Sequence, residues 1–361
     1  MKKVVVAGAS GLVGRGAIRA FLAAGDWEVI AVSRRKPDGL EGARHIAADL
    51  FDTQACAKIF SGLGDVTHLV YAALYEKDDL VAGWLDPEQI ARNDQMLRNL
   101  FEPLSAAAKN LCHVSLLQGT KAYGAHVRPI PVPAREDRDE FKSQANFYWN
   151  QESYLREKQK GQNWHWTILR PQIIFGDALG AAMNPIAAIG VYGALLKEKG
   201  EPLHFPGGAD NVLEGVDADL LGRAIKWAAE NDAAHDQAFN VTNGDVMVWR
   251  NLWPAIADAL GMARGDDRPL SLAASLPPRA AEWDAIRKKY ALAAPALADF
   301  AGKSLAYADF IMAYGSERSL MPAIVSTIKL RQAGFTEVMD SEAMMRKWIA
   351  DLQTHRLLPP R

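Results

Sequence analysis

Cysteine is scarce in this chain of 361 residues, which contains only Cys56 and Cys112. Neither cysteine has the spacing to a histidine or to another cysteine that a zinc site needs, so the sequence predicts neither a bound metal nor a disulfide framework. Two unpaired cysteines are typical of a protein in a reducing compartment. We therefore expect a cytoplasmic location.

An excess of charge of one sign is also missing. Lysine and arginine total 41, aspartate and glutamate total 43, and the net charge is −2. Such a chain has no basic field that would attract a phosphate backbone or an acidic membrane surface. We expect a small-molecule substrate as the partner, and neither nucleic acid nor a membrane, while a homodimer stays open.

Long apolar runs are almost absent. Residues 179–196 form the main exception, with 18 positions that carry no charge, which is just long enough to raise the question of a membrane span. The stretch contains Asn184, Pro185 and three glycines, and we expect a buried or substrate-lining helix instead. The apolar segment after Lys3 resembles a signal peptide only superficially, because the spacing of its glycines is better explained by the loop described below.

Short apolar strands alternate with helical patterns in the first half of the chain. We expect strands at residues 3–7, 27–33, 44–48, 68–73, 111–117 and 167–170, with helices between them that include residues 14–24. Runs such as residues 4–6 do not alternate with polar residues, as strands buried on both faces require. The pattern predicts an α/β protein with a Rossmann-type, doubly wound parallel sheet.

The alternation of predicted strands and helices ends after Gly176. The later segments look mostly helical, at residues 178–200, 249–261, 277–301 and 341–353. We predict a dinucleotide-binding domain over residues 1–177, to which segments within about 211–245 return, among them residues 212–216 and a strand at 238–241. A smaller, mostly helical substrate-binding lobe would then comprise residues 178–210 and 246–361.

Three glycines directly follow the first predicted strand and open the first helix. Their spacing provides a tight turn, a close approach of the backbone to a pyrophosphate, and close packing of helix on strand. The helix N-terminus also offers free N–H groups and the positive end of its dipole to phosphates. We predict a dinucleotide-binding loop that contains Gly8, Ser10, Gly11, Leu12, Val13 and Gly14.

The second predicted strand ends in Ser33, Arg34 and Arg35, where enzymes that prefer NAD usually carry an acid for the ribose 2′-hydroxyl. Two guanidinium groups suit a 2′-phosphate instead, because arginine pairs bidentately with phosphate oxygens. We therefore predict NADPH as the cofactor. Asp49 and Leu50 follow the third strand, where an adenine edge would lie, although Asp49 also fits an exposed loop.

Two tyrosines compete for a catalytic position. Tyr154 and Lys158 form the Tyr-x-x-x-Lys pair that short-chain dehydrogenases use, whereas Tyr148 has Glu152 at that spacing. Ligands of open α/β sheets bind at the carboxyl ends of the strands, where a crossover helix begins. If this helix begins near Asn146, Tyr154 lies about 9 Å further along the helix axis than Tyr148 and is rotated by about 120° from it. We expect Tyr148 to be the catalytic tyrosine.

Tyr148 then needs a cation from another segment. Lys121 lies in residues 118–124, which follow the strand at 111–117 and therefore reach the same carboxyl edge. We predict that Lys121 sits beside the Tyr148 hydroxyl and that its ammonium depresses the pKa of the phenol by favouring its charged form. The ordinary alternative is a solvated loop lysine.

Residues 118–124 (Gln-Gly-Thr-Lys-Ala-Tyr-Gly) and 146–152 (Asn-Phe-Tyr-Trp-Asn-Gln-Glu) together resemble the progesterone 5β-reductase and iridoid synthase-like enzymes. These are atypical short-chain dehydrogenases of the extended type that reduce enones with NADPH. Residues 33–35, 68–73, 170–176 and 243–246 also look like the pattern of that family, and the resemblance runs from the N-terminus to about residue 260. Trp149 departs from it, because many relatives look to carry a second tyrosine there.

The resemblance implies that Tyr148 and Lys121 are the catalytic pair. It also implies a cofactor site that includes the glycine loop, Arg34, Arg35 and Asp49, with further residues from the matching motifs: Tyr71, Ala72, Pro171, Ile173 and Ile174. The implied reaction is the 1,4-reduction of an α,β-unsaturated ketone or aldehyde, for example a steroid Δ4-3-ketone or a small enone. Hydride would enter at the β-carbon, and the pair would hold the resulting enolate oxygen.

Two alternative functions remain beside the enone reductase, and each requires different residues. An extended short-chain dehydrogenase or epimerase acting on a carbonyl or nucleotide sugar would use Tyr154 and Lys158. A non-catalytic NADPH sensor would keep the glycine loop but would not need Tyr148 and Lys121. The presence of both residues near the carboxyl edge favours the enone reductase over the sensor.

Overall fold

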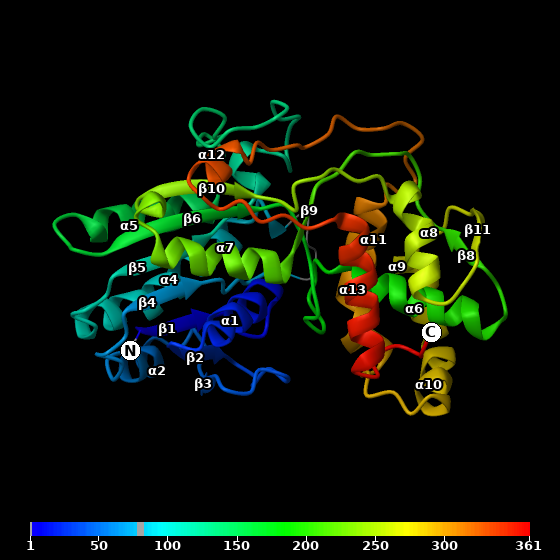
Figure 1. Ribbon diagram of the computed structural model, residues 1–361, viewed down its shortest axis with the longest axis horizontal. Helices are drawn as coiled ribbons and strands as arrows, with labels where there is room; N and C mark the ends of the chain where they lie inside the picture. Colours follow the sequence, from blue (N-terminus) through cyan, green and yellow to red (C-terminus); the bar gives the residue numbers. More distant parts are fainter. Residues whose placement is uncertain (1, 78–82) are drawn as a thin grey trace. The chain divides into compact units, whose positions relative to one another are not determined.

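The computed structural model describes residues 2–77 and 83–361, and the chain forms two compact units. Unit 1 comprises Met1–Gln172, Ala218–Val241 and Val325–Glu337, and unit 2 comprises Ile173–Asp217, Thr242–Ile324 and Val338–Arg361. The chain therefore passes between the two units several times, which can be followed by colour in Figure 1.

A seven-stranded sheet forms the centre of unit 1. Its order is β10-β6-β5-β4-β1-β2-β3, and its neighbouring strands are all parallel. The strands are β1 (Lys2–Ala7), β2 (Trp27–Ser33), β3 (Arg44–Ala47), β4 (His68–Tyr71), β5 (His113–Leu117), β6 (His165–Pro171) and β10 (Gln237–Val241). The direction of winding reverses between β1 and β4, and in such sheets ligands bind beyond the carboxyl ends of the strands at this reversal. The predicted Rossmann-type parallel sheet is confirmed.

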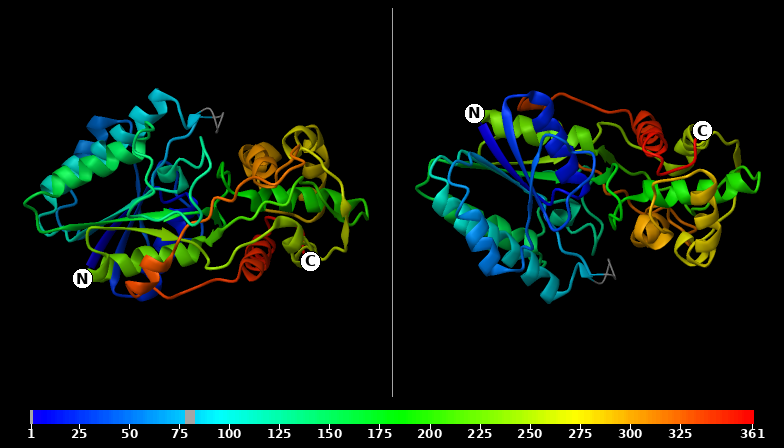
Figure 2. Two further views of the ribbon diagram at one scale, coloured as in Figure 1. Left: turned by 90° about the horizontal axis from the view of Figure 1, so that it is seen from above. Right: turned by 90° about the horizontal axis from the view of Figure 1, so that it is seen from below.

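Helices cover both faces of this sheet (Figure 2). On one face lie α1 (Leu12–Ala24) and α7 (Ala218–Glu230); on the other lie α2 (Thr53–Phe60), α4 (Pro87–Ala107) and α5 (Phe147–Gln159). The short helix α12 (Ile328–Gln332) packs near β10. Because each central strand is covered on both sides, successive residues such as Val4, Val5 and Val6 are all fully buried, which explains the unbroken apolar runs.

Unit 2 is mostly helical and is built around α6 (Pro185–Glu198), whose residues are buried without interruption from its start to Leu196. A helix that is apolar on all sides is an internal helix, so the expectation of a buried helix is confirmed. It begins only at Pro185, because the Asn184 side chain accepts a hydrogen bond from the Ile186 amide at 3.3 Å and caps the helix. Among the helices of the described chain, none combines the length and the apolar character that crossing a membrane requires.

Unit 2 also contains several further helices and short strands. Its remaining helices are α8 (Trp249–Ala259), α9 (Leu272–Ser275), α10 (Ala280–Lys289), α11 (Lys303–Ile311) and α13 (Ser341–Thr354). Two small parallel sheets join β8 (Leu203–Phe205) to β11 (Arg264–Asp267) and β7 (Ile173–Phe175) to β9 (Gly215–Asp217). Helices α10, α11 and α13 pack against α6.

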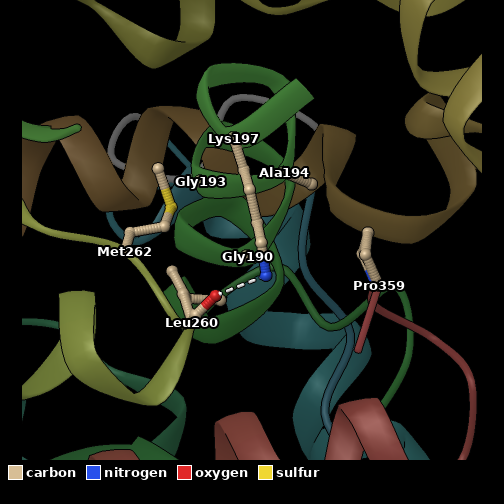
Figure 3. A pocket seen from close by; sticks show the side chains of 7 residues that line it. All are labelled: Gly190, Gly193, Ala194, Lys197, Leu260, Met262 and Pro359. Atoms are coloured by element: carbon tan, nitrogen blue, oxygen red, sulfur yellow. Dashed lines mark hydrogen bonds between the residues drawn. The ribbon is translucent and has the colours of Figure 1, made fainter. Parts of the chain in front are cut away.

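A cavity near the C-terminal end of α6 has a volume of about 10 Å³, room for a single water molecule and not for a substrate. Figure 3 shows Lys197 reaching across it to Leu260. The Lys197 ammonium donates hydrogen bonds to the carbonyl oxygens of Leu260 and Pro360, each at 2.9 Å. The lysine therefore ties α6 to the end of α8 and to the C-terminal residues.

The observed units differ in four places from the predicted domains, and two of these, residues 173–177 and 242–245, are short boundary segments that lie in unit 2 and not in the sheet domain. Residues 211–217 were expected to return to the sheet domain, but they lie in unit 2, because β9 pairs with β7 and not with a strand of the large sheet. Val325–Glu337, which was expected in the helical lobe, lies in unit 1, where it carries α12.

Candidate active site

The loop between β1 and α1 has the geometry of a phosphate-binding turn. Gly8 has a φ of +84°, and the amides of Gly8 and Ala9 both donate to the carbonyl oxygen of Val32, at 3.0 and 3.1 Å. A Cβ on Gly8 would lie 2.5 Å from the Ala72 carbonyl oxygen, and one on Gly14 would lie 2.2 Å from that of Gly8. Both positions therefore require glycine.

No side chain caps the N-terminus of α1, where Gly11 is the N-cap residue. The first N–H groups of this helix consequently remain available to a ligand at its positive end. A dinucleotide pyrophosphate fits this loop: the predicted residue Ser10 lies in the turn, and Leu12 and Val13 begin α1.

The residues predicted for the cofactor site after β2 and β3 lie at the same edge of the sheet. Arg34 and Arg35 are exposed just beyond β2, and the Ser33 hydroxyl donates to the Arg35 carbonyl oxygen at 2.6 Å, which fixes this turn. Two exposed guanidinium groups at this turn fit a 2′-phosphate. An Asp49 carboxylate oxygen accepts a hydrogen bond from the Phe51 amide at 3.0 Å, and Leu50 is buried.

The cofactor residues implied by the family resemblance lie in several different places. The Tyr71 side chain lies in the hydrophobic core of unit 1, and burial raises the pKa of its phenol, so only its backbone can face a ligand. The carbonyl of Ala72 lies directly against Gly8. Pro171 ends β6 in unit 1, whereas Ile173 and Ile174 form part of β7 in unit 2.

Lys121 and Tyr148 come together at the carboxyl edge of the sheet of unit 1. Lys121 lies in a short 3₁₀ helix, Thr120–Tyr123, just after β5, and its ammonium is 5.9 Å from the centroid of the Tyr148 ring. Tyr148 lies in the first turn of α5, because the Asn146 side chain caps this helix by accepting from the Tyr148 amide at 3.0 Å. The structure thus brings the two side chains near each other, and the expected contact between the ammonium and the phenol hydroxyl stays a prediction.

Gly119 leaves space in front of the Tyr148 hydroxyl. A Cβ at this position would lie 3.3 Å from the hydroxyl oxygen and 3.4 Å from the carbonyl oxygen of Pro171. Among the residues that the structure describes, none forms a hydrogen bond with this hydroxyl, although Tyr148 is only 7% exposed. A buried phenol of this kind can donate its hydrogen bond to a ligand.

Burial changes the pKa of both residues. It lowers the pKa of Lys121 to about 8, and the negative charge of Glu76 partly opposes this change. Burial, reinforced by the charge of Glu76, raises the pKa of Tyr148, and the Arg170 guanidinium opposes the rise. The expectation that the phenol pKa is depressed is therefore wrong, because loss of solvent outweighs the opposing positive charge of Arg170. Tyr148 is a neutral phenol at neutral pH.

Three side chains near Lys121 gave no recognisable signal in the sequence. The Lys121 ammonium lies 4.4 Å from the centroid of the Trp84 ring, and the Trp84 indole N–H donates to Glu76 Oε1 at 3.3 Å. The ring of His126 lies edge-on to Trp84, with 6.3 Å between centroids. Glu76 and Trp84 follow β4 and His126 follows the 3₁₀ helix, so only the folded chain brings them together.

A buried polar network anchors the segments that carry Lys121 and Tyr148. Arg170, which is only 1% exposed, donates to Gln118 Oε1 at 2.8 Å, to the Tyr123 hydroxyl at 3.3 Å, and to Glu140. The Gln118 amide donates in turn to Glu152 at 3.1 Å and to the Tyr148 carbonyl oxygen at 3.4 Å. Strand β6 is thereby connected to both the Lys121 segment and α5.

Tyr154 and Lys158 occupy a different environment. The Tyr154 hydroxyl donates to Glu102 of α4 at 3.3 Å, and the Lys158 ammonium lies 3.8 Å from the same carboxylate. Burial and the charge of Glu102 raise the pKa of Tyr154, and the Arg98 guanidinium lies 4.2 Å from the centroid of its ring. Tyr154 and Lys158 therefore contact α4, and both lie further along α5 than Tyr148.

The family model described as the PRISE-like Rossmann-fold domain matches residues 40–352, which is most of the chain. The protein belongs to this family. Among its relatives, the (S)-8-oxocitronellyl enol synthase ISY2 of Nepeta racemosa is 31% identical, over 98% of this chain and 91% of its own length. The 3-oxo-Delta(4,5)-steroid 5-beta-reductase of Arabidopsis thaliana is 29% identical, over 93% and 86% respectively. The resemblance stated from the sequence motifs is confirmed.

Solved structures show the same fold for this PRISE-like chain at much lower identity. A putative epimerase from Burkholderia cenocepacia superposes with a TM-score of 0.68 at 16% identity, and the match covers 98% of each chain. The enzyme WbmH of Bordetella bronchiseptica in complex with NAD+ superposes with a TM-score of 0.65 at 15% identity, covering 98% of this chain and 99% of the other. These similarities establish the fold.

Replacing Arg170 by methionine should destabilise the protein strongly. The substitution leaves Glu140 and Gln118 without their buried partner, and breaking a buried ion pair on one side costs about 3–5 kcal/mol. Urea unfolding monitored by circular dichroism would measure this loss. The control is Arg138→Met, an exposed arginine on the neighbouring segment, which should change stability by less than about 0.5 kcal/mol. Equal stability of the two variants would contradict the structural role of the network.

Proposed function

We propose that the protein is an NADPH-dependent reductase of α,β-unsaturated ketones or aldehydes that directs hydride to the β-carbon. The observation that carries this proposal is the meeting of the Lys121 ammonium and the Tyr148 phenol at the carboxyl edge of the sheet, with Glu152 at the position where the ordinary relay lysine would stand. The names of the relatives support it, since they include a steroid 5-beta-reductase and an enol synthase.

NADPH, held by the glycine loop and by Arg34 and Arg35, would supply the hydride. Addition at the β-carbon of an enone leaves negative charge on the carbonyl oxygen, and donors directed at that oxygen lower the barrier most. Tyr148 fits this role because its pKa is raised, so that it keeps its proton and donates a hydrogen bond. Lys121 adds a positive charge when the pH is below its pKa of about 8.

Glu152 supports addition at the β-carbon over direct reduction of the carbonyl. A carbonyl reductase must deliver a proton to the oxygen through a relay that begins at the lysine four residues after the tyrosine. Here Glu152 at that place is buried and bonded to Gln118 and Arg156, so it offers no mobile ammonium. In 1,4-addition the pair needs only to hold the oxyanion, while solvent protonates the α-carbon.

Substitution of the two tyrosines should separate the proposed mechanism from the Tyr154 alternative. Tyr148→Phe removes the donor to the oxyanion and should lower kcat on an enone by a factor of about 10² or more. Lys121→Met should act similarly, and the double variant should lose far less than the product of the single losses, because the two groups act as a unit. Steady-state consumption of NADPH would measure these rates.

Tyr154→Phe is the matched control, because it removes the hydroxyl of a second tyrosine on the same helix, and this residue is as buried overall as Tyr148. Its kcat should stay within a few-fold of the parent. A large loss in Tyr154→Phe together with a small loss in Tyr148→Phe would instead support the ordinary Tyr-x-x-x-Lys mechanism.

The cofactor preference should depend on the exposed arginines after β2. NADPH should bind more tightly than NADH, and Arg34→Ala or Arg35→Ala should reduce that preference at least tenfold, since a charge-assisted hydrogen bond contributes about 1.5–3 kcal/mol. Fluorescence titration with each cofactor would give the two dissociation constants. An unchanged ratio in both variants would show that neither arginine contacts a 2′-phosphate.

Isotopic labelling should locate the hydride. An α,β-unsaturated ketone incubated with NADPH that carries deuterium at the transferring position should yield a saturated ketone labelled at the β-carbon. With unlabelled NADPH in deuterated water, the label should appear at the α-carbon. Mass spectrometry and NMR of the product would distinguish these patterns from an allylic alcohol labelled at the carbinol carbon, which would refute the oxyanion-holding role of the pair.

A further inference from the structure

Glu76 is an acidic residue beside the catalytic pair to which the proposed reaction gives no role. It lies in the segment that follows β4, is half-buried, and accepts a hydrogen bond at 3.3 Å from the Trp84 indole N–H. The face of the same indole ring carries the Lys121 ammonium, 4.4 Å from its centroid. Trp84 therefore links a carboxylate at its edge to a cation on its face.

The Lys121 ammonium needs such a partner because its other surroundings are unfavourable to charge. Two aromatic rings, those of Trp84 and Tyr148, lie within 6 Å of it, and burial favours its neutral form. A buried cation is retained only where an opposite charge compensates for the lost solvent. Attraction by the faces of the rings contributes less than a full charge would.

The other charged and titratable groups around the pair do not supply this compensation. His126 is neutral at neutral pH, because burial and the charge of Lys121 lower its pKa to about 4. Tyr148 keeps its proton. Arg170 is itself a cation and is bound to Glu140. In the described part of the chain, Glu76 is the acid whose charge acts on Lys121.

We propose that Glu76 is a positioning residue for the catalytic cation: its carboxylate keeps Lys121 charged and holds the Trp84 ring on which the ammonium rests. This inference rests on the proposed function of Lys121. Glu76 acts in two ways, through its charge and through its hydrogen bond to Trp84, and substitutions can separate the two. Glu76→Gln removes the charge but keeps an acceptor for the indole N–H, whereas Trp84→Phe removes the hydrogen bond but keeps the charge.

The direct test is the titration of Lys121 in the full chain, followed by NMR of ¹³Cε-labelled lysine. The signal is assigned by its absence from Lys121→Met. In the parent it should titrate with a pKa of about 8. In Glu76→Gln it should titrate at lower pH, and Glu76→Asp should restore part of the difference. Glu157→Gln is the control, because Glu157 is exposed on α5 and paired with Lys160, and this variant should titrate like the parent.

The pH dependence of enone reduction should differ between the parent and the variants in the same way as the Lys121 titration. The rate of the parent should fall as the pH rises through about 8, because the neutral amine no longer stabilises the oxyanion. At pH 6, the rate of Glu76→Gln should stay within about threefold of the parent rate. At pH 8, the variant should be about tenfold slower than the parent, because its Lys121 has already lost its proton. Trp84→Phe should lower the rate at both pH values, with a smaller change in the pH profile.

An unchanged Lys121 titration in Glu76→Gln would overturn the role of Glu76, and a shift of equal size in Glu157→Gln would do the same by showing a general effect of net charge. The proposed function fails in a different way, namely if Lys121→Met reduces enones as fast as the parent. Because the titration does not depend on turnover, it decides the role of Glu76 toward Lys121 in either case.

Discussion

The guanidinium of Arg170 is the charge around which the site of this protein is organised. It is fully buried at the end of β6, and a buried cation must be paired and hydrogen-bonded on every side. Its partners come from the segment after β5, from Glu140, and through Gln118 from α5. Satisfying one buried charge therefore fixes the two segments that carry Lys121 and Tyr148.

The same constraint accounts for the acid at position 152, where ordinary short-chain dehydrogenases carry a lysine. Glu152 lies 3.9 Å from Arg170 and accepts from the Gln118 amide. A lysine at position 152 would place a second cation beside the buried guanidinium and would remove the nearer of the two acceptors of the Gln118 amide. The acid at position 152 is thus part of the same arrangement of charges as the buried guanidinium.

Local patterns were sufficient to predict the parts of the fold that depend on short-range physics. The apolar strands, the turn at Gly8 and the cap at Asn146 each follow from a few neighbouring residues, and the cap in turn placed Tyr148 at the start of α5. The return of Val325–Glu337 to unit 1 and the pairing of β7 with β9 depend on distant contacts. The positions of Glu76 and Trp84, and the raised pKa of Tyr148, also arise only once the chain has folded.

The raised pKa of Tyr148 changes how the pair should be understood. A phenol whose pKa is depressed is suited to giving up its proton, whereas a buried phenol that keeps its proton is suited to donating a hydrogen bond to a charge that appears beside it. Lys121, with its pKa near 8, supplies the charge that the phenol lacks. In the proposed reaction one residue would orient the oxyanion and the other would neutralise it, and neither would be consumed. This division of roles would suit a reaction in which the new bonds form at carbon, and it would place the pH sensitivity of the site on Lys121.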